Sequence, residues 1–171
     1  MPSTLAAISE RLATLHTAFG QNVVHDEKVW ELRLEEADLD GLPGFARDGA
    51  RQAAAERGVE GFVITLARSS IEPFLTFSRR RDLRQVAYQA WVARGMHDGP
   101  HDNRVLVPEI LALRAERARL LGYASYAEFR LADSMAASQA NVARLMREVW
   151  GAAKHRADEL LGLAAALMHQ H

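Results

Sequence analysis

Residues 104–128 read RVLVPEILALRAERARLLGYASYAE, and this stretch has the pattern of two consecutive helices. Its apolar residues recur every three or four positions, which places them on one face of a helix over 104–121. The residues of that face are Leu106, Ile110, Leu113 and Leu120. Gly122 is a typical helix stop, and Ser125 and Glu128 have the spacing of a capping box that begins a short second helix. The stretch therefore predicts a helical fold.

The rest of the chain repeats this helical periodicity and interrupts it at two short segments. Further helices are predicted over residues 3–24, 45–57 and 79–95, and from residue 138 onward. Pro73 is predicted to break or begin a helix. Apolar and polar residues alternate at 29–34 and again at 62–66, which is the pattern of half-buried strands that could pair and pack on helices. The predicted fold is mainly α: a single multi-helix domain over 1–171 with one small two-stranded antiparallel β ribbon.

The composition excludes several classes of protein. The chain has 171 residues, 49% of them apolar and 25% charged, as in globular domains. The net charge of -1 argues against a nucleic-acid partner, because phosphate binding needs an excess of positive charge. The chain contains no cysteine, which excludes disulfides and thiolate metal sites. No apolar run approaches the roughly 20 residues of a membrane span, so we expect a soluble, cytoplasmic protein with no membrane partner.

Histidine and aspartate residues cluster at 97–102, between two predicted helices. His97 and His101 have the spacing that brings two imidazoles together on a helix, as in many zinc sites. Gly99 and Pro100 lie between them and break any helix there. We interpret the segment as a polar loop; the alternative is a metal site with His97 and His101 as ligands. The sequence shows no catalytic constellation and no cofactor-binding motif, so no catalytic or cofactor-binding residue is assigned.

Other charged groups have a structural interpretation. Residues 79–84 carry four arginines at the start of a predicted helix, where they oppose the helix dipole. We expect Asp82 or Glu72 to pair with them, and an anion-binding patch is the alternative. His155 is expected to form a surface ion pair on the last helix, and the histidines within 169–171 are expected to be disordered.

Several short motifs occur in a fixed order along the chain. They are ERLA to FGQNV at 10–23, DGLP at 40–43, GFVITL at 61–66, PFL at 73–75, RG at 94–95, DNR at 102–104, EILALRAERA at 109–118, LLGYASYAE at 120–128 and DSMA at 133–136. In this order they resemble the thimet oligopeptidase, oligopeptidase A and peptidyl-dipeptidase family of zinc metallopeptidases, over roughly residues 8–160. The resemblance implies a largely helical body upstream of the catalytic half, in enzymes that hydrolyse short peptides.

The zinc motif of that family, H-E-x-x-H with a downstream glutamate, is absent from this sequence. We therefore expect no cofactor in this chain, although the full-length family implies zinc. One hypothesis is a fragment or truncated homologue of the peptidase that is inactive alone and needs a complementary catalytic chain. The alternative is a free-standing interaction module that binds short peptides or a partner chain. Both predict an exposed apolar surface on the last helix, and self-association as a two-fold dimer.

Overall fold

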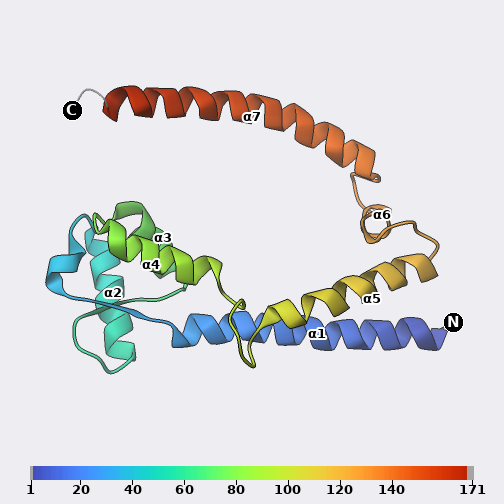
Figure 1. The fold of residues 1–171 in the computed structure, drawn as a ribbon, viewed down its shortest axis with the longest axis horizontal. Coiled ribbons are helices and arrows are strands. Elements are labelled where there is room, and N and C mark those ends of the chain that lie inside the picture. The colour runs from blue at the N-terminus through green and yellow to red at the C-terminus, as the bar shows by residue number, and fades with distance from the viewer. Residues whose placement is uncertain (1, 169–171) are drawn as a thin grey trace. The chain divides into compact units, whose positions relative to one another are not determined.

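The computed structural model describes residues 2–168 (Figure 1). This part of the chain forms seven α-helices, two short 3₁₀ turns and one two-stranded antiparallel sheet. The predicted fold class, mainly α with one small ribbon, is confirmed. The chain divides into two compact units, residues 1–111 and residues 112–171. No helix among the described residues combines the length and the apolarity that a membrane span requires.

The first unit is built from four helices and the start of a fifth. They are α1 (Pro2–Val29), α2 (Gly44–Glu56), α3 (Arg68–Phe77), α4 (Arg81–Val92) and α5 (Val107–Leu120), which continues into the second unit. The predicted apolar stripe of α1 is buried at Ile8, Leu12 and Leu15. An ion pair between Arg11 and Glu109, 2.6 Å apart, joins α1 to the first turn of α5.

The ribbon pairs β1 (Leu32–Leu34) with β2 (Phe62–Ile64), with Arg33 opposite Val63. The prediction that the first strand begins at residue 29 is wrong. Val29 ends α1, and the N–H of Trp30 still donates to the carbonyl oxygen of Asp26 at 3.0 Å. The second strand is buried on both faces rather than half-buried, because α2 packs against it.

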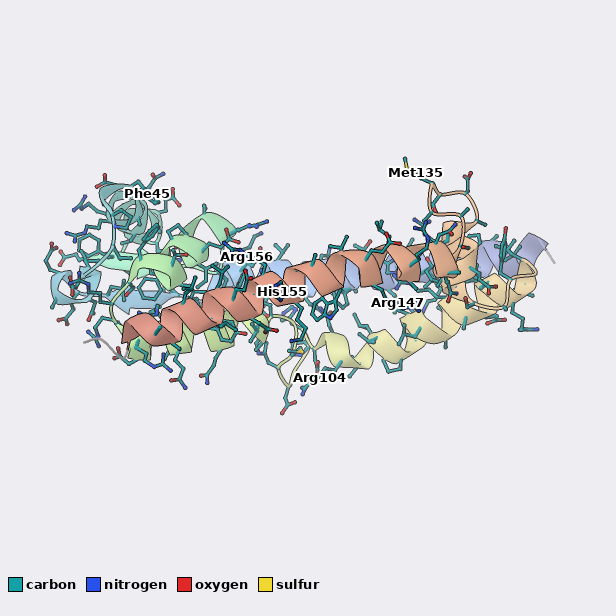
Figure 2. All side chains as sticks on the ribbon, turned by 90° about the horizontal axis from the view of Figure 1, so that it is seen from above. Phe45, Arg104, Met135, Arg147, His155 and Arg156 are labelled. Carbon is teal, nitrogen blue, oxygen red and sulfur yellow. The ribbon has the colours of Figure 1, made fainter. Side chains whose placement is uncertain are left out.

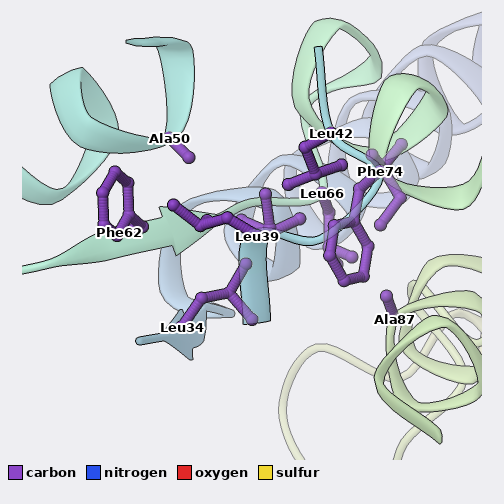
Figure 3. Close-up of a cluster of buried hydrophobic side chains, with 10 residues drawn as sticks. Leu34, Leu39, Leu42, Ala50, Phe62, Leu66, Phe74 and Ala87 are labelled. Carbon is purple, nitrogen blue, oxygen red and sulfur yellow. The ribbon is translucent and has the colours of Figure 1, made fainter. Parts of the chain in front are cut away.

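The core of the first unit lies where the ribbon, the turn after β1 and α2 to α4 meet (Figure 3). Its buried members are Leu34, Leu39, Leu42, Ala50, Phe62, Ile64, Leu66, Ile71, Phe74 and Ala87. Leu39 belongs to a 3₁₀ turn at Glu36–Leu39, whose sharp path returns the chain toward the core. Phe74 is the largest of the fully buried side chains. Two of the core residues, Ile71 and Phe74, come from α3, for which the sequence predicts no helix.

The helix α3 contradicts the expectation that Pro73 breaks or begins a helix. Pro73 lies in the interior of α3. A proline there removes one backbone hydrogen bond and costs about 3 kcal/mol. Ile71 and Phe74 on the same helix are fully buried, so packing offsets that cost. Tertiary contacts thus outweigh the local preference of proline.

The second unit contains the rest of α5, the short helix α6 (Tyr126–Leu131) and the long helix α7 (Gln139–Met168). Gly122 ends α5 with a φ of +84°, as predicted. The predicted cap of α6 is confirmed, because the N–H of Glu128 donates to the Oγ of Ser125 at 3.1 Å. The fully exposed Met135 projects from the loop between α6 and α7 (Figure 2).

Candidate functional site

The loop between α4 and α5 folds back onto the C-terminal half of α1, and Asp26 is one point of attachment. The backbone N–H of Gly95 donates to the Oδ2 of Asp26 at 2.6 Å, and the Nε2 of His97 lies 2.7 Å from the same oxygen. Asp26 is only 6% exposed, so water competes little for its hydrogen bonds. One carboxylate oxygen thus holds both the backbone and a side chain of the loop.

A second attachment point lies one helical turn earlier on α1. The Nδ2 of Asn22 donates to the Oδ1 of Asn103 at 2.9 Å, and the Nδ2 of Asn103 donates to the carbonyl oxygen of Phe19 at 3.1 Å. The Nδ1 of His101 lies 3.1 Å from the Oδ1 of Asn22 and must donate, because that oxygen can only accept. The ring of His101 also stacks on His25, with centroids 3.7 Å apart. These contacts fix the end of the loop on the helix.

We call these residues the polar clamp. Its members are Asn22, Asp26, His97, His101 and Asn103.

The environment of Asp26 favours its ionised form. Burial raises the pKa of this carboxyl, but the hydrogen bonds from Gly95 and His97, with the attraction of His97 and His25, outweigh burial and lower the pKa below its ordinary value. Asp26 is therefore an anion at neutral pH. A buried carboxylate with two donors is a stable anchor for a loop.

Charged side chains at the rim of the polar clamp are also paired. Arg94 pairs with Glu27 of α1, and its Nε donates to the carbonyl oxygen of Trp91 at 2.9 Å. Arg104 donates to both oxygens of Asp102, and these hydrogen bonds lower the pKa of that carboxyl despite its desolvation. The rim therefore carries both signs of charge in local pairs.

The donor set of the polar clamp does not fit zinc. A structural or catalytic zinc ion needs at least three convergent protein ligands. His97 is directed to Asp26 and His101 to Asn22, and the nearest oxygen of Asp26 already accepts two hydrogen bonds. Across residues 2–168 there is no group of three or more His, Asp or Glu side chains that could hold a metal ion. The arrangement can position the loop on α1.

Three members of the polar clamp were missed by the sequence reasoning: Asn22, Asp26 and Asn103. The apolar stripe of α1 runs through positions 8, 12, 15 and 19, and the same spacing continues to 22 and 26. A polar residue at such a position faces the interior and needs a partner. The position of Asn22 and Asp26 on the apolar stripe therefore indicates that they are buried, whereas no local pattern indicates the burial of Asn103.

The remaining predicted charged groups lie in separate surface pairs. Arg80 pairs with Asp38 and with Asp82, and its hydrogen bond lowers the pKa of Asp82 to about 2. The predicted pairing of this patch is therefore confirmed through Asp82, whereas Glu72 pairs with Arg68 of its own helix at 2.7 Å. On α7, His155 lies 3.2 Å from Glu159, as predicted for a surface ion pair. His169 and His171 lie outside the described residues.

Gly95→Ala is expected to weaken the polar clamp. Gly95 has a φ of +70°, where an alanine costs about 1–2 kcal/mol. Its Cβ would also collide with the Nδ2 of Asn103, which cannot move without losing its hydrogen bond to Phe19. We expect the free energy of unfolding to fall by about 2–4 kcal/mol, measured by urea denaturation followed by circular dichroism.

Gly58→Ala is the matched control for this variant. Gly58 has nearly the same φ, +67°, but no atom lies within 4 Å of its would-be Cβ. The control should therefore show the backbone cost of about 1–2 kcal/mol alone. Equal losses in the two variants would show that Asn103 yields at no cost, and that the polar clamp is not tightly packed at Gly95.

Comparison with known proteins shows similarity to one family of proteins. A sequence model described as Peptidase family M3 matches residues 74–171. Oligopeptidase A of Haemophilus influenzae is 36% identical over 159 residues, which cover 90% of this chain and 23% of that protein. Dipeptidyl carboxypeptidase of Escherichia coli is 30% identical over 169 residues, covering 97% of this chain and 25% of that protein.

A plant relative shows a similar extent of matching. The Arabidopsis thaliana protein named "Probable cytosolic oligopeptidase A" is 35% identical over 137 residues, covering 75% of this chain and 19% of that protein. The chain thus spans about a quarter or less of the length of each relative. The family model covers only the loop residues of the polar clamp, because α1 lies before residue 74.

Proposed function

The chain belongs to peptidase family M3, and we propose that it forms part of the non-catalytic helical scaffold of a peptidase that hydrolyses short peptides. The observation that carries this proposal is the similarity to oligopeptidase A over 90% of the chain, combined with a donor set that does not fit zinc. In this role the polar clamp fixes one loop of the scaffold on α1 and performs no chemistry. The name of the cytosolic relative supports a cytoplasmic location, which is part of the proposal.

The proposal assigns the metal chemistry to residues outside this sequence. M3 peptidases are zinc metallopeptidases, and zinc in such enzymes activates a water molecule for attack on a carbonyl. The histidines best placed to bind a metal here, His97 and His101, are engaged by Asp26 and Asn22 instead. We therefore propose that these 171 residues have no peptidase activity by themselves and that another polypeptide segment or chain supplies the zinc ligands.

Purified 171-residue chain is expected to leave a quenched fluorescent oligopeptide uncleaved, with or without added zinc. The physical reason is that three zinc ligands and a bound water are needed for this hydrolysis. Release of fluorescence is the measurement, and Haemophilus influenzae oligopeptidase A in the same buffer is the positive control. Zinc-dependent turnover by this chain, abolished by a chelator and restored by zinc, would contradict the proposal.

A free-standing interaction module is the second candidate function. It is favoured by large apolar side chains that remain exposed on α7, among them Trp150 at 68%. Such a module would bind short peptides, a partner chain or a second copy of itself. Fluorescence anisotropy of a labelled oligopeptide distinguishes the two functions. An interaction module should bind the peptide, whereas a scaffold should show no binding.

A further inference from the structure

One side of α7 carries large apolar side chains that are exposed to solvent. They are Leu145, Met146, Val149, Trp150, Leu160, Leu161 and Leu163, each between 50% and 68% exposed. At 100° per residue these positions fall within about 160° of the helix circumference. We call them the apolar face of α7. A contiguous surface of this kind on a water-exposed helix indicates a missing partner.

The opposite side of α7 is polar and needs no partner. Arg144 pairs with Glu148 at 3.2 Å, and Lys154 pairs with Asp158 at 2.7 Å, both across one helical turn. His155 also projects from this helix (Figure 2), and helical spacing places it on the polar side. The sequence of α7 is therefore that of a helix with one face in water and the other against protein.

The apolar face has two features that a partner must match. A shallow groove of about 460 Å³ can receive a side chain, and it is lined by Leu145, Met146, Arg147, Val149, Trp150 and Ala153. Arg156 interrupts the apolar face and pairs with Glu159 at its edge, at 2.8 Å. The partner surface must therefore be mainly apolar and must leave this ion pair either solvated or hydrogen-bonded.

The width of the apolar face argues against a second copy of this chain as its partner. A symmetric pair of helices buries the narrow seam of a two-stranded coiled coil, whereas a stripe wider than about 100° is typical of a helix that faces the core of a larger body. The family model matches α7 to its end, and about three quarters of the length of each relative lies outside the segment matched by this chain. A larger helical body is thus available in proteins that share this helix.

We propose that the apolar face of α7 docks on the part of an M3 peptidase that lies outside the segment matched by this chain. The inference rests on the proposed scaffold function and adds the surface through which the scaffold is held. Trp150 and Val149 contribute the central contacts, because they lie next to each other in the groove.

Cysteine labelling tests this docking, because the chain has no cysteine of its own. Val149→Cys places a thiol on the apolar face, and His155→Cys is the control on the polar side of the same helix, outside the groove. Each variant is prepared in the 171-residue chain and in Haemophilus influenzae oligopeptidase A whose aligned segment is replaced by this chain. Alkylation rates at each thiol are followed by peptide mass spectrometry. We expect Val149→Cys to react about tenfold or more slowly in the chimera, and His155→Cys to react equally in both.

The outcomes separate the docking from the proposed function. Equal rates for Val149→Cys in the isolated chain and in a chimera that cleaves peptides would overturn the docking and leave the scaffold function standing. Protection of Val149→Cys already in the isolated chain would also overturn the docking. If light scattering then shows a dimer, the apolar face binds a second copy of the chain. If it shows a monomer, the apolar face is covered within the chain itself. A chimera without peptidase activity would contradict the proposed function and the docking together.

Discussion

Phe74→Ala is expected to lower the free energy of unfolding by about 3–5 kcal/mol. Phe74 is fully buried at the centre of the core formed by the ribbon and α2 to α4 (Figure 3). The truncation loses the transfer free energy of an aromatic ring and leaves a cavity that the surrounding side chains fill only in part. Because domains of this size are stable by about 5–15 kcal/mol, much of the stability would be lost. Urea denaturation followed by circular dichroism measures the change.

Phe45→Ala is the control with the same chemical change. Phe45 is 64% exposed and makes one edge-on contact with Phe77, with ring centroids 6.4 Å apart. Such a contact contributes about 1 kcal/mol or less at the surface. If Phe74→Ala does not fold, Phe74→Leu retains most of the volume and should cost roughly 1–2 kcal/mol. Similar losses in the free energy of unfolding for Phe45→Ala and Phe74→Ala would contradict the central position of Phe74 in the core.

The elements that the sequence predicts are those with a strong local signal. The stripe of α1 follows from Ile8, Leu12 and Leu15 at helical spacing, and the end of α5 follows from Gly122. The helix α3 could not be predicted, because Pro73 opposes it locally and the burial of Phe74, which stabilises it, depends on elements elsewhere in the chain. Local patterns cannot report packing between segments that are distant in sequence.

The polar clamp shows the same limit for a site. His97 and His101 were recognised as a cluster, but their partners on α1 lie 71 and 79 residues away in sequence. Spacing rules for metal ligands compare residues that are close together in the sequence. They therefore could not indicate that each histidine has a partner on α1. Asp26 could have been found as a polar residue at an apolar stripe position, whereas its pairing with Gly95 required the fold.

Asp26→Asn is expected to lower the free energy of unfolding by about 1.5–3 kcal/mol at neutral pH, the range for hydrogen bonds to charged groups. The amide keeps one acceptor oxygen but removes the charge that attracts His97 and His25. The NH2 group of the new asparagine side chain would also place N–H donors inside a buried site. Chemical denaturation measures the loss, and faster hydrogen exchange at the Gly95 amide would locate it at the polar clamp.

The pH dependence of Asp26→Asn distinguishes loss of the charge from a packing defect. The pKa of Asp26 is lower in the folded protein than its ordinary value of about 3.9. Ionised Asp26 therefore contributes its full stabilisation above that ordinary value, and the contribution is lost as the pH falls through the lowered pKa. The difference between wild type and Asp26→Asn should therefore shrink in strong acid, as the pH falls through the lowered pKa. Asp48→Asn is the control, because Asp48 forms an exposed pair with Arg51 and should change stability by about 0.5 kcal/mol or less. A difference for Asp26→Asn that persists unchanged in acid would mean that its carboxylate charge does not hold the loop on α1.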